Sequence, residues 1–244
     1  GCGNCFSVCP DSAIPGLVND ISDVFSSAIS SIEKGGQPTQ YLRRFVRDAE
    51  KKLRAMIEVA GEAAPVNKLI DKAILTTLAE SDVQDGGRKQ LEQECGWLMQ
   101  TLGDFSFAIT KPYYLTREKK ARGSGALFSV TINPYTCKGC MECVDVCDDE
   151  ALVATPQTKE AIEKLQHDWK FWLELPSTKP EFIRISDLDE KIGALETLLL
   201  DKNNFAAMSC GDGSCVGCGE KSVIRLFTST VTALMQPRVK AHVN

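Results

Sequence analysis

The sequence predicts an α+β chain in which a small cysteine-rich unit is split by a helical insertion. Two observations predict this fold class. Cysteines recur at short, regular intervals in residues 2–9 and again in residues 137–147, and the stretch between them changes to the apolar period of 3.6 residues that is typical of helices. We therefore expect the split unit at 1–19 and 126–155, a mainly helical insertion at 20–125, a helical linker at 156–205 and a last segment at 206–244.

The second cysteine segment carries the most specific motif. Its cysteines follow the spacing C-x2-C-x2-C-x3-C, at Cys137, Cys140, Cys143 and Cys147. In two-cluster ferredoxins this spacing gives three thiolates to one 4Fe–4S cluster, while the fourth cysteine binds the other cluster. Gly139 fits such a loop, because a side chain there would obstruct its close wrapping around the cluster. A zinc site is the alternative, although zinc sites usually pair two separated C-x2-C units.

The first cysteine segment repeats the same array. Cys2, Cys5 and Cys9-Pro10 match its last three cysteines, whereas Asp148 stands where a second proline is expected after Cys147. The first cysteine of this array should lie just before Gly1, and because an initiator Met is also lacking, we interpret the chain as a piece of a longer polypeptide. Exchange of the last cysteines then gives cluster one Cys2, Cys5, Cys147 and a ligand before Gly1, and gives cluster two Cys9, Cys137, Cys140 and Cys143.

Composition and charge argue against some classes of protein, namely nucleic-acid-binding and membrane-spanning proteins. A chain of 244 residues can bury a core, and its net charge of -5 without a long basic run argues against nucleic acid as a partner. The sequence lacks an apolar run of roughly 20 residues, so we expect no membrane span. Eleven cysteines, an odd number, at cluster spacing indicate thiolate ligands in a reducing compartment, so the predicted location is the cytoplasm.

The insertion should consist of four helices. Apolar residues share one face in each of four stretches, at about 20–35, 42–61, 69–78 and 87–102. Cys95 lies on one of these apolar stripes, so we predict a buried core thiol and no ligand role. Strands are expected at 16–18, 105–109, 127–132 and 152–154, a charged loop at 116–125, and further helices starting at 155 and 186.

The helix predicted at 42–61 also has a basic side. Its cations lie off the apolar stripe, at Arg43, Arg44, Arg47, Lys51, Lys52 and Arg54. We interpret them as a solvated helix face. The alternative is a docking patch for an acidic electron carrier.

A third cysteine group lies near the end of the chain. Cys215-Val-Gly-Cys218-Gly-Glu220 leads into an apolar helix, and Cys210 precedes it without an assigned role. Alone, this motif indicates half a zinc site or a redox-active dithiol. Because two cysteines cannot hold a cubane cluster, the remaining cluster ligands would lie beyond Asn244.

The two long arrays followed by the motif at 215–220 resemble the 2-oxoacid:ferredoxin oxidoreductase family, and in particular its pyruvate:ferredoxin (flavodoxin) oxidoreductases. The resemblance implies a two-cluster ferredoxin-like unit and, at 206–244, the beginning of an α/β domain that binds thiamine diphosphate. It implies that Cys215 and Cys218 hold half of a proximal cluster and that Glu220 lies near the thiamine site. No catalytic residue is assigned.

The resemblance also implies a reaction. The full-length enzyme would decarboxylate a 2-oxoacid, pyruvate above all, with coenzyme A, thiamine diphosphate and Mg2+. This chain would pass the electrons through 4Fe–4S clusters to ferredoxin or flavodoxin. It would be inactive alone and part of a homo-oligomer when full length.

Two other functions belong to different classes. A ferredoxin-type electron-carrier module of another iron–sulfur complex, without thiamine chemistry, explains both long arrays but leaves the motif at 213–220 unexplained. A zinc-structured interaction protein would be colourless, whereas clusters make a protein brown.

Overall fold

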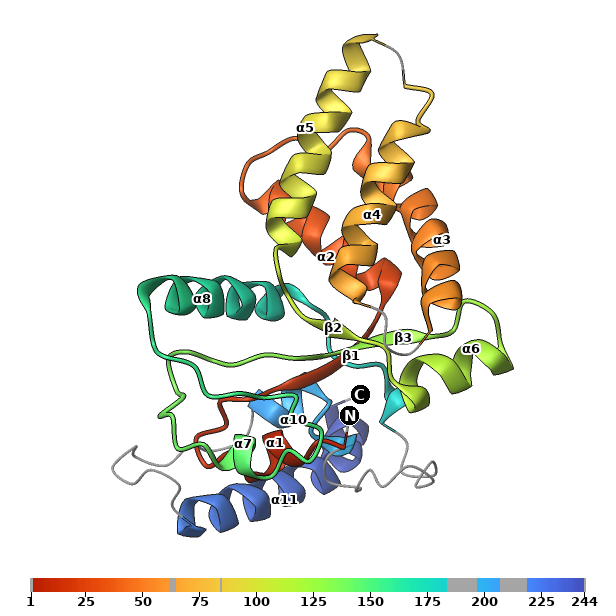
Figure 1. Ribbon diagram of the computed structural model, residues 1–244. Coiled ribbons are helices and arrows are strands. Elements are labelled where there is room, and N and C mark those ends of the chain that lie inside the picture. Colours follow the sequence, from red (N-terminus) through yellow and green to blue (C-terminus); the bar gives the residue numbers. More distant parts are fainter. Residues whose placement is uncertain (1, 62–64, 84, 184–196, 207–218, 244) are drawn as a thin grey trace. The chain divides into compact units, whose positions relative to one another are not determined.

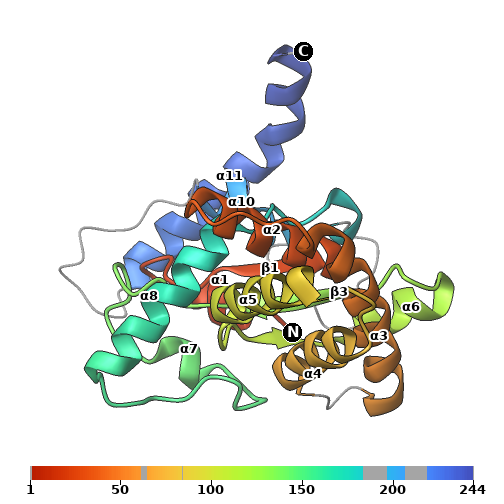
Figure 2. The ribbon, with the colours of Figure 1, turned by 90° about the horizontal axis from the view of Figure 1, so that it is seen from above.

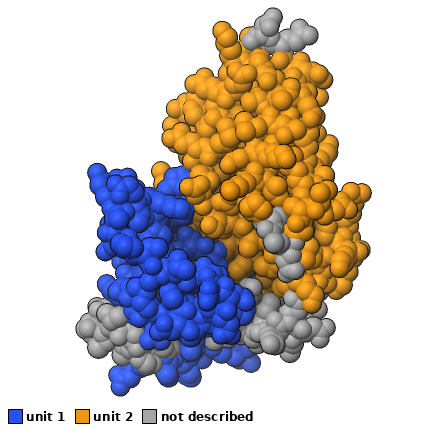
Figure 3. Space-filling view, viewed as in Figure 1, with its two compact units in different colours: residues 1–18, 130–169, 177–244 blue, residues 19–129, 170–176 orange. Residues whose placement is uncertain are grey.

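The computed structural model describes residues 2–61, 65–83, 85–183, 197–206 and 219–243. It divides into two compact units, coloured separately in Figure 3. Unit 1 comprises residues 1–18, 130–169 and 177–244, and unit 2 comprises residues 19–129 and 170–176. The part of the chain that is described contains no helix long and apolar enough to cross a membrane.

Unit 2 is built on the four helices predicted for the insertion, and all four are confirmed. Figures 1 and 2 show them beside one another: α2 (Ile21–Lys34), α3 (Leu42–Ala60), α4 (Val66–Ala79) and α5 (Asp85–Leu102). Each turns its apolar stripe inward, and Phe25, Leu53, Ile74 and Leu98 are each at most 1% exposed. Burial of these stripes provides the hydrophobic free energy that keeps the four helices together.

A buried carboxylate caps the start of α3. Glu94, on α5, is 0% exposed, and its carboxylate oxygens accept the backbone N–H groups of Gln40, Tyr41 and Leu42 at 2.9, 2.9 and 3.1 Å. The first N–H groups of a helix have no partner within the helix, and its N-terminus favours negative charge. Glu94 therefore satisfies three donors and fixes α5 against α3.

A three-stranded sheet connects the two cysteine segments to the insertion. Its order is β1 (Gly16–Asp20), β3 (Ala126–Val130) and β2 (Phe107–Ala108). β2 and β3 are antiparallel, with Phe107 opposite Ser129. β2 is shorter than the strand predicted at 105–109, and the strand predicted at 152–154 is wrong, because residues 152–158 have no regular secondary structure.

The charged segment before β3 is helical, so the loop predicted at 116–125 is wrong over its first half. A π-helix, η1 (Lys111–Leu115), continues directly into α6 (Thr116–Lys120). Glu118 holds the end of this segment, since its carboxylate accepts the N–H groups of Gly123 and Gly125 at 2.7 and 2.8 Å. Charge and glycine content predicted an unsupported loop, whereas hydrogen bonds to the nearby Glu118 carboxylate hold the segment in place.

The cations of α3 mostly have acidic partners within unit 2. Arg43 pairs with Glu33, Lys51 with Asp48, Lys52 with Glu80, and Arg54 with Glu50. This pairing supports the interpretation as a solvated helix face.

Unit 1 contains the cysteine segments and the end of the chain. Its helical elements are α1 (Asn4–Val8), α7 (Glu142–Asp145), the first part of α8 (Lys159–Glu174), η2 (Pro180–Phe182), α10 (Lys202–Ala206) and α11 (Gly219–Val243). α8 begins four residues later than the helix start predicted at 155. The helix predicted from 186 lies mostly outside the described residues.

The cap on α3 gives a stability prediction. In Glu94→Gln an amide N–H2 replaces one acceptor oxygen and faces backbone donors, so we expect unfolding in urea to require about 2 kcal/mol less free energy. Glu92→Gln is the matched control, because Glu92 is an exposed residue of the same helix that pairs only with Arg88 among the described contacts. Its effect should stay below about 0.5 kcal/mol. Equal urea midpoints, followed by helical circular dichroism, would contradict the assigned role of Glu94.

Candidate functional site

The two cysteine segments adopt the same backbone turn. The short helix α1 is preceded by Gly3 in the left-handed conformation (φ 87°, ψ 1°), and α7 is preceded by Met141 in that conformation (φ 68°, ψ -2°). In both segments this residue directly follows a cysteine and stands two residues before the next one. The carbonyl of Gly3 accepts hydrogen bonds from the N–H groups of Phe6 and Ser7. The carbonyl of Met141 accepts them from Val144 and Asp145. The repeated cysteine spacing thus corresponds to a repeated local structure.

The repeat continues past the last cysteine of each array. Three residues after Cys9 and Cys147, Ser12 and Glu150 have φ values of 48° and 49°. One residue further, the N–H groups of Ala13 and Ala151 donate to Sγ of Cys9 and Cys147, each at 3.2 Å. Among the described residues, Ser12, Met141 and Glu150 are the non-glycine residues with positive φ. Such backbone conformations cost free energy and are concentrated at functional sites.

Four of the predicted ligands line one cavity in unit 1. A cavity of about 410 Å³ is lined by Cys9 from the first segment and by three cysteines of the second, Cys137, Cys140 and Cys143. Its remaining wall is largely apolar and includes Ile14, Val144, Ile162 and Leu165. Burial raises the pKa of the Cys143 thiol, and the nearby Cys9, Cys140 and Cys137 raise it further. The four thiols therefore share one cavity and lie close enough for their charges to interact.

Two further predicted ligands, Cys2 and Cys147, lie near Cys5. Burial raises the pKa of Cys5 to about 12, and Cys2, Cys147 and Cys143 add to this shift, while a backbone hydrogen bond at Phe6 opposes it. Cys2 and Cys5 come from the start of the chain, and Cys147 comes from the end of the second array. The close approach of α1 and α7 brings these thiols together.

The donor set can be compared with the two kinds of metal site that cysteines form. Within the described ranges, no three His, Cys, Asp or Glu side chains converge closely enough to hold one metal ion. A 4Fe–4S cluster has a different requirement, because each thiolate binds a different iron and the sulfurs stand further apart. A cavity lined by four cysteines is compatible with that requirement. In addition, the buried Oγ1 of Thr136, next to Cys137, has no hydrogen-bond partner among the described residues, which leaves it a free donor.

The two segments differ in exposure. Cys9, Asp11, Ser12 and Ala13 are buried, whereas Cys137 is exposed and so are most residues of the turn from 138 to 150. At Gly139 a side chain would meet no protein atom within 4 Å, and the positive φ of 67° favours glycine at this position.

The third cysteine group cannot be placed. Cys210, Cys215 and Cys218 lie outside the described residues. Glu220 is an exposed residue in the first turn of α11. Of the three predicted groups of thiols, the structure thus brings two together.

Sequence reasoning missed the groups that support the thiols. Ala13 and Ala151 donate through their backbone, which leaves no side-chain signature except a small residue four positions after the last cysteine of each array. Ile162 and Leu165 follow the start predicted at 155 for a helix, and they also line the cavity. By contrast, Cys95 was predicted as a core thiol, and its exposure of 0% confirms this.

Two curated proteins are similar to part of this chain. A mitochondrial pyruvate dehydrogenase (NADP+) of Euglena gracilis is 27% identical over 128 residues, which are 52% of this chain and 6% of that protein. A pyruvate dehydrogenase (NADP+) of Cryptosporidium parvum is 32% identical over 114 residues, which are 45% of this chain and 5% of that protein. No family model and no solved structure matches the chain. Both similar proteins are pyruvate dehydrogenases by name, and the chain matches only a small part of the length of each.

The buried position of Cys95 gives a pH-dependence. Burial, and secondarily Glu94, raise the pKa of this thiol to about 12, so the neutral form dominates at pH 8. Alkylation proceeds through the thiolate, so its rate at Cys95 should rise about tenfold per pH unit from 8 upward without a plateau before pH 11. Peptide mass spectrometry after iodoacetamide treatment measures this rate. A plateau near pH 9 would show an unperturbed thiol.

Proposed function

We propose that this chain is the electron-transfer portion of a pyruvate oxidoreductase of the 2-oxoacid:ferredoxin oxidoreductase type. The observation that carries the proposal is the cavity lined by Cys9 together with Cys137, Cys140 and Cys143, which come from segments far apart in the sequence. The grouping of Cys2, Cys5 and Cys147 supports a second site of the same kind. Pyruvate as the substrate is supported by the names of both similar proteins.

Iron–sulfur clusters supply one-electron transfer at potentials set by their surroundings. The residues of this chain would orient and tune them. Cys9, Cys137, Cys140 and Cys143 would hold cluster two, and Cys2, Cys5 and Cys147 would give three ligands to cluster one. The N–H groups of Ala13 and Ala151 would stabilise negative charge on Sγ of Cys9 and Cys147. Ile14, Ile162 and Leu165 would keep water from one side of cluster two.

The proposed partners depend on how many electrons are transferred in each step. The names of both similar proteins contain NADP+, which accepts a hydride, whereas clusters deliver single electrons. A one-electron carrier, ferredoxin or flavodoxin, is the partner that we propose for the clusters themselves, while NADP+ is named only for the two similar proteins. Cys215 and Cys218 as ligands of a proximal cluster, Glu220 near thiamine diphosphate and Mg2+, and coenzyme A as co-substrate belong to the proposal for the full-length protein.

The ligand assignment is tested by the iron content of anaerobically purified protein. We expect Cys140→Ala to lose the iron, the visible absorbance and the low-temperature EPR signal of cluster two while it keeps the helical content of unit 2. Cys95→Ala is the matched control, because it also removes one buried or half-buried thiol but lies in the insertion. Iron content that is unchanged in Cys140→Ala, or lost equally in both variants, would contradict the assignment.

The pyruvate step is tested in a full-length polypeptide that contains this segment. Pyruvate with coenzyme A should bleach the visible absorbance of the clusters in the absence of oxygen. An electron-carrier module of another complex would bind iron equally well but would show no pyruvate-dependent bleaching. These two measurements therefore separate cluster binding from oxoacid chemistry.

A further inference from the structure

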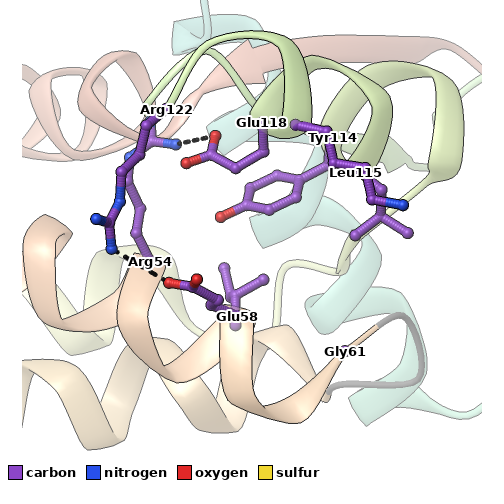
Figure 4. Close-up of a pocket in the computed structure, with 9 residues that line it drawn as sticks. Arg54, Glu58, Gly61, Tyr114, Leu115, Glu118 and Arg122 are labelled. Carbon is purple, nitrogen blue, oxygen red and sulfur yellow. Dashed lines mark hydrogen bonds and ion pairs between the residues drawn. The ribbon is translucent and has the colours of Figure 1, made fainter.

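The helical insertion contains a pocket that the proposed electron transfer does not use. It lies within unit 2, between the second half of α3 and the segment η1–α6, and has a volume of about 430 Å³ (Figure 4). This is within the range of small-molecule sites. Its inner surface is formed by Ile57, Tyr114 and Leu115, and the exposed lining residues are Glu58, Lys119 and Arg122.

The walls of the pocket are braced in the absence of any ligand. The Arg54 guanidinium binds Glu50 at 2.9 Å and Glu118 at 3.4 Å, and it donates to the carbonyl of Gly125 at 3.1 Å. Gly125 is required at this point, because a Cβ there would stand 2.8 Å from Glu118 Oε2 and 3.0 Å from the Tyr114 ring. Arg54 thus joins α3 to α6 and to Gly125, and a ligand would meet a surface that these contacts hold in place.

The π-helix determines where Tyr114 lies. π-helical turns are rare and occur frequently at functional sites. Here Thr110 caps the turn, the ring of Tyr114 is 2% exposed, and Figure 4 shows it between Glu118 and Glu58. Burial raises the pKa of Tyr114, against the opposing effect of Arg54, so its hydroxyl stays protonated and can donate a hydrogen bond.

The charges at the mouth favour an anion. Glu118 is already neutralised, since Arg54 and the N–H groups of Gly123 and Gly125 bind its carboxylate. Arg122 pairs with Glu58 at 3.3 Å, but these side chains are 87% and 72% exposed, and such a pair contributes little and is readily exchanged. Lys119 adds a second exposed cation.

We infer that this pocket binds a small amphipathic organic acid, with its apolar body against Ile57, Tyr114 and Leu115 and its carboxylate beside Arg122 and Lys119. Aromatic and aliphatic acids share this chemistry. The site is independent of the cysteine segments, so its occupancy would not require bound iron. Inorganic phosphate has the charge without the apolar body and should bind far more weakly.

The inference is tested by titrating the 15N-labelled chain with 4-phenylbutyrate, octanoate and inorganic phosphate. The backbone amide of Gly61, which lines the pocket, and those of Gly123 and Gly125, which donate to the lining residue Glu118, report on the pocket in two-dimensional NMR spectra. We expect at least one of the two organic acids to shift them saturably, and phosphate to leave them unchanged at the same concentration. Tighter binding of 4-phenylbutyrate would assign aromatic acids, and tighter binding of octanoate would assign aliphatic ones.

Two charge reversals on exposed residues complete the test. Arg122→Glu should weaken binding by roughly tenfold or more, because a carboxylate then faces the ligand's carboxylate. Arg47→Glu makes the same change in net charge on an exposed position of α3 that does not line the pocket, and it should leave the affinity unaltered. Shifts confined to α11, which exposes Phe227 and Leu234, or equal affinities in both variants would overturn the inference.

Discussion

The structure depends on a backbone constraint that is met twice. Each cysteine array must reverse direction tightly enough to face several thiols toward one point, and each does so through left-handed residues before and after a short helix. Gly3 adopts this conformation without strain, whereas it has an energetic cost at Met141 and at the equivalent residues Ser12 and Glu150. Strain that recurs at equivalent positions indicates a shared structural requirement, since the surrounding sequences differ. Thiol grouping is the feature that both turns have in common.

The same constraint explains how a large insertion is accommodated. The chain enters unit 2 through β1 and leaves it through β3, and these strands are neighbours in the sheet. Hydrogen bonds from Thr131 to Pro15 and from Asn133 to Ala13 continue their antiparallel pairing toward the cysteines. The two ends of the insertion therefore lie close together, and the entropic cost of closing even a long loop grows slowly with its length. The insertion can carry its own core without separating the two cysteine arrays.

Local chemistry determined which features could be predicted from the sequence. The four helices were predictable because stripes such as Phe45, Ala49 and Leu53 repeat at helical spacing, and the thiol groups were predictable because cysteine spacing encodes a loop. The helix η1–α6 was missed because the capping carboxylate of Glu118 satisfies a segment whose composition favours a loop. The strand at 152–154 failed for a related reason: its apolar residues line the cavity and do not pair with a strand. The partners of Glu94 lie more than fifty residues away along the chain, and a single sequence does not reveal such pairs.

The surroundings of the individual thiols bear on how the two proposed clusters would differ. Hydrogen bonds to sulfur and exposure to water both set the potential of a cluster. The N–H···Sγ bonds at Cys9 and Cys147 have the same length, so they cannot distinguish the two proposed clusters. Exposure varies within the proposed cluster two, because Cys9 is buried and Cys137 is exposed, whereas Cys2, Cys5 and Cys147 of the proposed cluster one are all half-buried. Among the predicted ligands that the structure describes, Cys137 is the exposed one, so we propose that a carrier in solution would approach the clusters at its surface.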